Sequence, residues 1–181
     1  TVVKALAVKD GFIDSAYGAV AITIDGDKVE SSENLALGKT VTASSESGEK
    51  AANVVDGSST SRWQAQDSTD DQWIQVDLGS VKSVNTVAID WEGAYAQKYQ
   101  IQVSTDGEEY NTVKAVTATK ADTAEFVFDE AVDAQFVKIL CKKDGFGYPY
   151  SIWEVGAFGT EKGEGVTTVA PTTVAPAQDE T

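Results

Sequence analysis

Histidine is absent from the 181 residues, and cysteine occurs once. Without histidine the chain lacks the commonest general base, the Ser/His/Asp and Cys/His catalytic arrangements, and any zinc site built on imidazole. The single cysteine, Cys141, excludes a disulfide within the chain. It lies in the apolar run FVKILCK, which predicts a small buried thiol rather than a reactive nucleophile. These absences remove most of the side-chain chemistry that enzymes use.

Long hydrophobic runs and basic clusters are absent too. No run of about 18 or more apolar residues occurs, and the first residues, TVVKALAVKDG, lack the basic start and apolar block of a signal peptide. We therefore expect no membrane insertion, and we expect the chain to be a piece of a longer protein. Lys and Arg number 14 against 29 Asp and Glu, which gives a formal net charge of -15. This charge would repel a polyanion, so no nucleic-acid partner is expected.

The chain does contain a series of strand patterns between residues 33 and 160. In WIQVDLG, residues 73–79, polar and apolar side chains alternate with the two-residue period of a half-buried strand. Similar runs occupy residues 84–91, 98–104, 124–129, 135–142 and 151–158, and Asp106 with Gly107 predicts a tight hairpin turn. No stretch has convincing helical periodicity. The sequence predicts an all-β fold, an antiparallel β-sandwich or jelly roll with one core.

The two ends of the chain differ from this central region. Residues 2–8 and 19–24 alternate weakly around a turn, as in a hairpin too small to be stable alone. From Gly163 onward the sequence repeats TTVAP and predicts a semi-stiff linker, which implies further modules. The predicted organisation is residues 1–30 as terminal strands of a preceding domain or a linker, 33–160 as the main domain, and 161–181 as a linker.

The stretch AANVVDGSSTSRW, residues 51–63, gathers one carboxylate and several hydroxyls around a glycine. Calcium prefers about six to eight hard oxygen ligands, several of which a tight acidic turn can present at once. The alternative is an ordinary Asp-Gly turn stabilised by serine side chains. On this segment alone, the ordinary turn is the favoured interpretation.

Five motifs occur in order along residues 34–159: NLALGKTVTASS, AANVVDGSSTSRW, QWIQVDLG, WEGAYAQKYQIQVSTDG and YPYSIWEVGAFG. Their order and spacing resemble the discoidin fold, the coagulation factor type C domain, and within that group carbohydrate-binding module family 32. The resemblance is closer to modules attached to chitosan- and β-glucan-degrading enzymes. It implies a galactose-binding-like β-sandwich jelly roll. Near the N-terminus, KALAVKDGFIDS resembles the end of the small immunoglobulin-like domain of chitobiase-type enzymes.

The resemblance also implies a buried structural calcium ion. By position it assigns the ion to the carboxylates of Asp56 and Glu154, the hydroxyl or carbonyl of Ser61, and backbone carbonyls near Asn53 and Ser58. Glu154 would then connect the last strand to the Asp56 loop.

For a sugar, the related chitosan-binding modules use acidic residues, an arginine and a tyrosine in the loops at one end of the sandwich. By position, the implied ligand-binding residues are Glu46, Arg62, Asp67, Glu92 and Tyr150, with the loop tyrosines Tyr95 and Tyr148 as further candidates. Aromatic rings stack on the C–H faces of sugars, and carboxylates attract a glucosamine ammonium. Galactose-binding members commonly use a histidine, which this chain lacks.

The charged candidates each have a structural alternative. Glu46 and Asp67 are also explained as solvated charges of an acidic protein. Arg62 is also explained as an ion-pair partner of Glu92 or Asp56.

The aromatic residues divide into expected core residues and expected ligand contacts. The tryptophans occupy strand positions and are predicted to pack in the core: Trp63, Trp73, Trp91 and Trp153. Tyr150 follows Pro149 in a loop-like stretch, so we predict that it is exposed and that it contacts ligand more readily than Tyr148.

These features favour a non-catalytic carbohydrate-binding module of a secreted, multimodular bacterial glycan-degrading enzyme. We expect an extracellular monomer, linked covalently to catalytic modules, that binds oligo- or polysaccharides of β-linked gluco- or amino-sugars. The alternative ligands are host glycans containing galactose, N-acetylgalactosamine or N-acetyllactosamine.

Two other classes of function fit the sequence less well. A glycosidase needs paired carboxylates about 5–10 Å apart, for which Glu46, Asp67 and Glu92 are the available acids. A domain of this size with acids only in loops more often binds than hydrolyses. An adhesion or protein-binding role, as in animal discoidin relatives, usually needs apolar spikes and basic residues, whereas these loops are polar and acidic.

Overall fold

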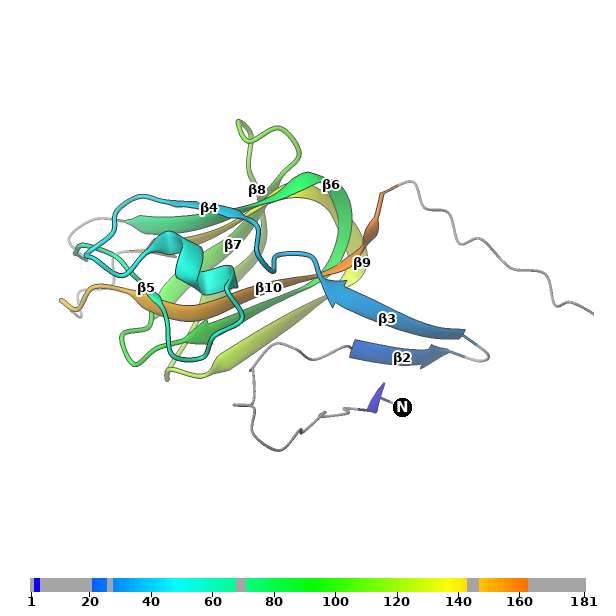
Figure 1. The fold of residues 1–181 in the computed structure, drawn as a ribbon, viewed down its shortest axis with the longest axis horizontal. Helices are drawn as coiled ribbons and strands as arrows, with labels where there is room; N and C mark the ends of the chain where they lie inside the picture. The colour runs from blue at the N-terminus through cyan, green and yellow to red at the C-terminus, as the bar shows by residue number, and fades with distance from the viewer. Residues whose placement is uncertain (1, 4–20, 26–27, 68–70, 143–146, 163–181) are drawn as a thin grey trace, which may run out of the picture.

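The computed structural model describes residues 2–3, 21–25, 28–67, 71–142 and 147–162 (Figure 1). Within these residues the strands are β1 (Val2–Val3), β2 (Ala21–Asp25), β3 (Lys28–Asn34), β4 (Thr40–Ala43), β5 (Trp63–Gln64), β6 (Gln72–Trp91), β7 (Lys98–Ser104), β8 (Asn111–Thr117), β9 (Thr123–Lys142) and β10 (Ser151–Glu161). The helical structure in this part of the chain is a single 3-10 turn, η1 (Ala51–Val55). All strand pairs are antiparallel, which confirms the predicted all-β fold.

Two long strands, β6 and β9, bend and contribute to both layers of the sandwich (Figure 1). The N-terminal half of β6 pairs with β4 and with the C-terminal half of β9, which continues through β7 to β8. The C-terminal half of β6 pairs with β10 and with the N-terminal half of β9. The first layer is therefore β4-β6-β9-β7-β8, and the second layer is β3-β10-β6-β9.

The bends explain why sequence patterns predicted pairs of strands here. The predicted strands 73–79 and 84–91 are the two halves of β6, and 124–129 and 135–142 are the halves of β9. Between these halves the register of the β6–β9 pairing shifts twice, once between Asp77 and Lys82 and once between Val84 and Thr86. The strands β3, β4, β5 and β8 were not predicted. Two of them are short, and β8 is an edge strand with little burial and no clear alternation.

The core lies between the two layers and follows the predicted alternation. Ile74, Val76 and Leu78 of β6 are at most 1% exposed, while Gln75 between them is only partly buried. Cys141 is fully buried, as its apolar surroundings predicted.

The four tryptophans do not share one environment. Trp63 and Trp91 are 0% and 5% exposed and belong to the core, as predicted. The same prediction is wrong for Trp73 and Trp153, which are partly exposed and lie outside the core cluster. Because successive side chains of a strand face opposite sides of the sheet, the burial of their neighbours turns these two rings outward.

At the N-terminal side, β2 and β3 form a hairpin, and the end of β3 pairs with β10 through Glu33 and Asn34. Strand β3 thus runs from the segment predicted to precede the main domain into that domain. Most of the predicted N-terminal segment and the TTVAP repeats fall in residues 4–20 and 163–181, outside the described residues. In the described part of the chain, no helix has the length and apolar character needed to cross a membrane.

Candidate functional site

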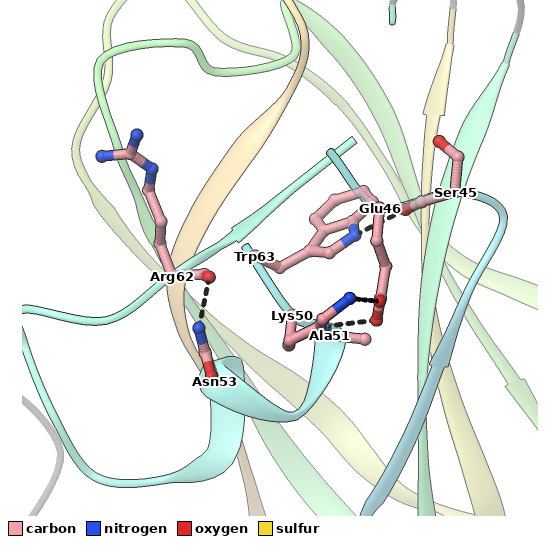
Figure 2. Close-up of polar contacts among 7 residues, drawn as sticks. All are labelled: Ser45, Glu46, Lys50, Ala51, Asn53, Arg62 and Trp63. Carbon is pink, nitrogen blue, oxygen red and sulfur yellow. Dashed lines mark hydrogen bonds and ion pairs between the residues drawn. The ribbon is translucent and has the colours of Figure 1, made fainter. Parts of the chain in front are cut away.

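The loop after η1 is held in shape by its own side chains. One carboxylate oxygen of Asp56 accepts a hydrogen bond from the Ser58 amide at 2.8 Å, and the other accepts one from the Ser61 hydroxyl at 2.7 Å. Asn53 closes the base of the loop, because its side-chain amide donates to the Arg62 carbonyl at 2.8 Å (Figure 2). Four of the five residues assigned to calcium therefore share one compact turn.

The fifth, Glu154, lies in β10 against this turn and is 1% exposed. Neither of its carboxylate oxygens has a hydrogen-bond partner of acceptable geometry within the described residues. The pKa of Glu154 is raised to about 8, first by burial and then by the neighbouring Asp56 carboxylate, while the nearby amides of Gly57 and Ser58 act in the opposite direction. A buried carboxylate without partners beside a second carboxylate is destabilising unless a proton or a cation compensates the charge.

The chemistry of this site fits a hard cation. The described residues contain no group of three or more His, Cys, Asp or Glu side chains arranged around a possible metal position. An ion between Asp56 and Glu154 would therefore complete its coordination with hydroxyl and carbonyl oxygens, as calcium does. The serine hydroxyls and backbone carbonyls of the turn are the oxygens available next to Asp56.

A second group of predicted residues lies in four segments at one end of the sandwich, which we call the end loops: residues 44–50, 64–67, 92–97 and 147–151. Backbone hydrogen bonds join them in series: Ser47 N to Gln64 O, Ala65 N to Tyr150 O, Ser151 N to Ala94 O and Glu92 N to Ser151 O, all between 2.9 and 3.1 Å. The segments that the sequence predicted to bind sugar are thus brought together from distant parts of the chain.

The end loops carry two carboxylates that backbone amides hold in place. Glu46 accepts a hydrogen bond from the Ala51 amide at 2.7 Å and pairs with Lys50 at 3.1 Å (Figure 2). The amide, and then the lysine, lower the pKa of Glu46, so this side chain is ionised at neutral pH. Glu92 accepts a hydrogen bond from the Ala94 amide at 3.0 Å. A carboxylate offers about four acceptor positions, so both retain capacity to bind a ligand.

Asp67 and Tyr95 also lie in the end loops. Asp67 is exposed. Tyr95 is half-buried and packs against the core, so part of its ring surface is already used in packing.

Arg62 is placed differently from the other predicted sugar contacts. Its side chain extends away from Glu46 (Figure 2), and its guanidinium lies over the Trp153 ring, 5.5 Å from the ring centroid. Among the described residues no ion pair connects Arg62 with Glu92 or Asp56. The structure therefore separates the Arg62 guanidinium from the Glu46 carboxylate.

The prediction that Tyr150 is exposed is wrong. Tyr150 is 1% exposed, and its hydroxyl donates to the Lys142 carbonyl at 3.0 Å. Its position directly before β10, with its carbonyl bound to Ala65, draws the ring into the core. Tyr148, two residues earlier, is 67% exposed and is the open aromatic ring of this loop.

Sequence reasoning missed two residues that position the loop bearing Glu46. The Ser45 hydroxyl donates to the side-chain carbonyl of Gln72 at 2.6 Å. The Ser45 carbonyl accepts from the Trp63 indole at 2.9 Å (Figure 2). Gln72 is 7% exposed. No local signal connects Ser45 with Gln72, because the contact arises only when β6 packs beside the loop.

Comparison with known proteins identifies a matching domain family and similar solved structures. Residues 40–155 match the F5/8 type C domain family. Chitosan-binding module 1 of a chitosanase/glucanase from Paenibacillus sp. IK-5 is 42% identical, with a TM-score of 0.67 over 70% of this chain and 99% of that one. Module 2 of the same enzyme, solved in complex with chitotriose, is 35% identical, with a TM-score of 0.66 over 70% of this chain and all of that one.

A longer relative is the polysaccharide lyase 8 family protein HylA of Enterococcus faecalis. It is 41% identical over 93 residues, which make up 50% of this chain and 6% of that protein. The chain thus spans only a small fraction of the length of this relative.

Proposed function

Because the chain belongs to the F5/8 type C domain family, we propose that residues 33–160 are a carbohydrate-binding module that takes β-linked gluco- or amino-sugar chains at its end loops. The domain is similar to chitosan-binding modules, one of which was solved with chitotriose. The proposal extends that ligand class to this chain and assigns the contact to the Tyr148 ring and the Glu46 and Glu92 carboxylates.

The observation that carries this proposal is the exposure of Tyr148 at the end where these carboxylates lie. Its side chain is 67% exposed, although large aromatic side chains are usually buried. A free ring can stack on the C–H face of a pyranose. The Glu46 and Glu92 carboxylates at the same end would accept hydrogen bonds from sugar hydroxyls or from the ammonium of glucosamine. Asp67, exposed in the neighbouring loop, would add to the negative potential.

The similarity to known modules supports binding rather than hydrolysis. The similar solved domains at 42% and 35% identity are described as chitosan-binding modules of a chitosanase/glucanase. We therefore assign no catalytic role to the end loops.

We also propose a structural calcium ion between Asp56 and Glu154. When bound, it would supply positive charge to two carboxylates that otherwise repel each other, and would join β10 to the loop after η1. The support for this site is the pair of Glu154 oxygens without hydrogen-bond partners, together with the Ser61 hydroxyl and the backbone carbonyls near Asn53 and Ser58.

The wider context of the module is part of the proposal. The similarity to a small fraction of a polysaccharide lyase family protein supports a module attached to a carbohydrate-active enzyme. The Thr- and Pro-rich repeats after Gly163 have the composition of a linker between such modules. Secretion would bring the module to its polysaccharide, where it would raise the local concentration of a linked catalytic domain.

Isothermal titration calorimetry of the 181-residue chain with chitotriose tests the sugar site. We expect Tyr148→Ala and Glu92→Gln each to weaken binding about tenfold or more, which corresponds to about 1.4 kcal/mol. Val127→Ala serves as the control, because Val127 is 70% exposed on β9, away from the end loops, and should leave affinity unchanged.

Unchanged affinity in both end-loop variants would refute the assigned site. A glycan array that retains only galactosides would refute the ligand class and favour the galactose alternative.

A further inference from the structure

The outer surface of the first layer carries large apolar side chains that the core does not use. Trp73, Phe136 and Leu140 are partly buried, yet none belongs to the core cluster or packs against it. They alternate with buried residues along β6 and β9, so they face solvent on the side opposite the second layer. Apolar groups gathered on one exposed face commonly mark a binding surface.

Strand register aligns the side chains of this surface in rows that cross the layer. Phe136 pairs with Asp77 at one edge, and two further rows follow toward the start of β6. In one row Gln75 of β6 pairs with Lys138 of β9, which pairs with Gln102 of β7. In the other row Trp73 pairs with Leu140, which pairs with Gln100.

Threonines extend the first row at both ends, because Thr42 pairs with Gln75 and Thr112 pairs with Gln102. With strands about 4.8 Å apart, this row spans roughly 19 Å. We call the surface formed by both rows the amide-aromatic face.

A tyrosine from the loop before β8 folds onto this face. Tyr110 donates its hydroxyl hydrogen to the side-chain carbonyl of Gln75 at 2.5 Å. The Lys138 ammonium lies 3.2 Å from the centroid of the Tyr110 ring and 5.2 Å from that of Trp73. In the described part of the chain Lys138 has no carboxylate partner. The ammonium hydrogens that do not point at these rings are therefore available to a ligand lying beside Lys138.

Apart from Lys138, the polar groups of the rows are amides and hydroxyls rather than charges. Gln102 donates to both Gln100 and Thr112 at 3.2 Å, so the amides are already oriented. Lys138 and the neighbouring Asp77 at the edge supply charges of opposite sign. In a chain of net charge -15 such a neutral face is distinctive, and it would repel neither an uncharged ligand nor one rich in hydroxyls.

We propose that the amide-aromatic face is a second carbohydrate-binding site, which takes a neutral β-linked glucan chain lying across the strands. Trp73 provides the stacking surface for a pyranose ring. The side chains of Gln75, Gln102 and Lys138 provide hydrogen bonds to hydroxyl groups along the chain. The amide row interrupts the apolar patch, which favours a ligand rich in hydroxyls over an obligate protein partner, whose interface would be more apolar. This site lies on the face of a sheet and not at the end of the sandwich, although the Trp73 backbone is hydrogen-bonded to Ser44 of the end loops at 2.9 Å.

Affinity electrophoresis of the full 181-residue chain in gels containing a soluble β-1,3/1,4-glucan tests this site. The end-loop double variant Glu92→Gln with Tyr148→Ala should still be retarded by the glucan. In that background Trp73→Ala should weaken retardation about tenfold, while Trp73→Phe, which keeps a ring, should lose less. Equal retardation with and without Trp73→Ala would overturn the second site, and so would loss of all retardation in the end-loop double variant.

Because Trp73→Ala removes a large side chain, a loss of binding in this variant can also reflect a change in folding. A second measurement therefore uses the unmodified protein. Titration with a β-1,4-linked glucose oligosaccharide should shift the side-chain amide signals of Gln75, Gln100 and Gln102 in a nitrogen-proton NMR spectrum. Shifts confined to the end loops would overturn the proposal. Failure of the end-loop site would appear separately, as unchanged chitotriose affinity in the Tyr148→Ala variant.

Discussion

At the scale of single residues, two tyrosines separated by one proline have opposite roles. Tyr150 precedes the first residue of β10, and its backbone is already paired with Ala65, so its ring enters the core. Tyr148 lies outside this pairing and remains exposed. A local sequence pattern that marks both as loop residues cannot separate them, because the difference arises from the strand pairing of the second residue.

Tyr150→Phe should reduce the free energy of unfolding by about 1 kcal/mol, because it removes the hydrogen bond from the hydroxyl to the Lys142 carbonyl but keeps the buried ring. Urea denaturation, monitored by fluorescence, measures the change in the free energy of unfolding. Tyr148→Phe is the matched control and should leave stability within about 0.5 kcal/mol of the parent. If Tyr150→Phe weakened chitotriose binding at unchanged stability, Tyr150 would again be a ligand contact.

At the scale of elements, the contact between β10 and β6 depends on one glycine. The pairing register of the two strands shifts between Phe158 and Gly159. A Cβ atom on Gly159 would lie 1.9 Å from the Ser83 carbonyl oxygen, a distance that requires the backbone of one strand to move. Glycine is required here because two backbones approach closely, not because of an unusual φ.

Gly159→Ala should destabilise the domain by about 3 kcal/mol or more, since overpacking against a backbone atom cannot be relieved by a side-chain rotation. Thermal and urea denaturation measure the loss. Gly93→Ala is the control, because a Cβ atom there meets nothing within 4 Å. If the two variants were equally stable, the backbones of β6 and β10 would move apart at little energetic cost, and the prediction would be wrong.

At the scale of the whole molecule, negative charge is the dominant property. The chain carries a formal net charge of -15, and Asp56 and Glu154 bring two carboxylates together beside the core. A bound calcium ion would stabilise the folded state by mass action, because the unfolded chain does not assemble the site. Removing the ion would then lower the stability of the folded domain without changing the end loops.

We expect a chelator to lower the melting temperature by roughly 10 °C relative to calcium at about 100 times its Kd, a difference of about 2.7 kcal/mol. In chelator the unfolding free energy should also fall as pH rises from about 4.5 to 8. The folded state holds the Glu154 proton with a pKa of about 8, whereas the ordinary value for a glutamate is 4.5, so ionisation costs stability in the folded state.

In calcium the same pH rise should increase the stabilisation that the ion supplies, because protons and calcium compete for the Glu154 carboxylate. The two stability curves should therefore separate as pH rises. Chitotriose affinity should change little at fixed pH, since the sugar contacts lie in other loops. Identical curves with and without calcium would contradict the metal assignment.

Composition and local patterns in the sequence were sufficient to predict the fold class and the positions of the principal strands, and to exclude imidazole chemistry. Alternation in residues 73–79 requires a strand with one buried side, Asp106 and Gly107 require a turn, and the absence of histidine excludes imidazole chemistry. Each of these conclusions depends on neighbouring residues or on composition, which the sequence states directly.

The tertiary structure alone decided which surface each side chain reaches. Alternation shows that a strand has two faces, but the second layer determines which face is buried, so Trp63 and Trp91 enter the core while Trp73 faces solvent. The end loops and the Asp56–Glu154 pair likewise exist only because β10 and β6 bring distant segments together. Long-range backbone pairing sets these contacts, and no local pattern encodes the partner.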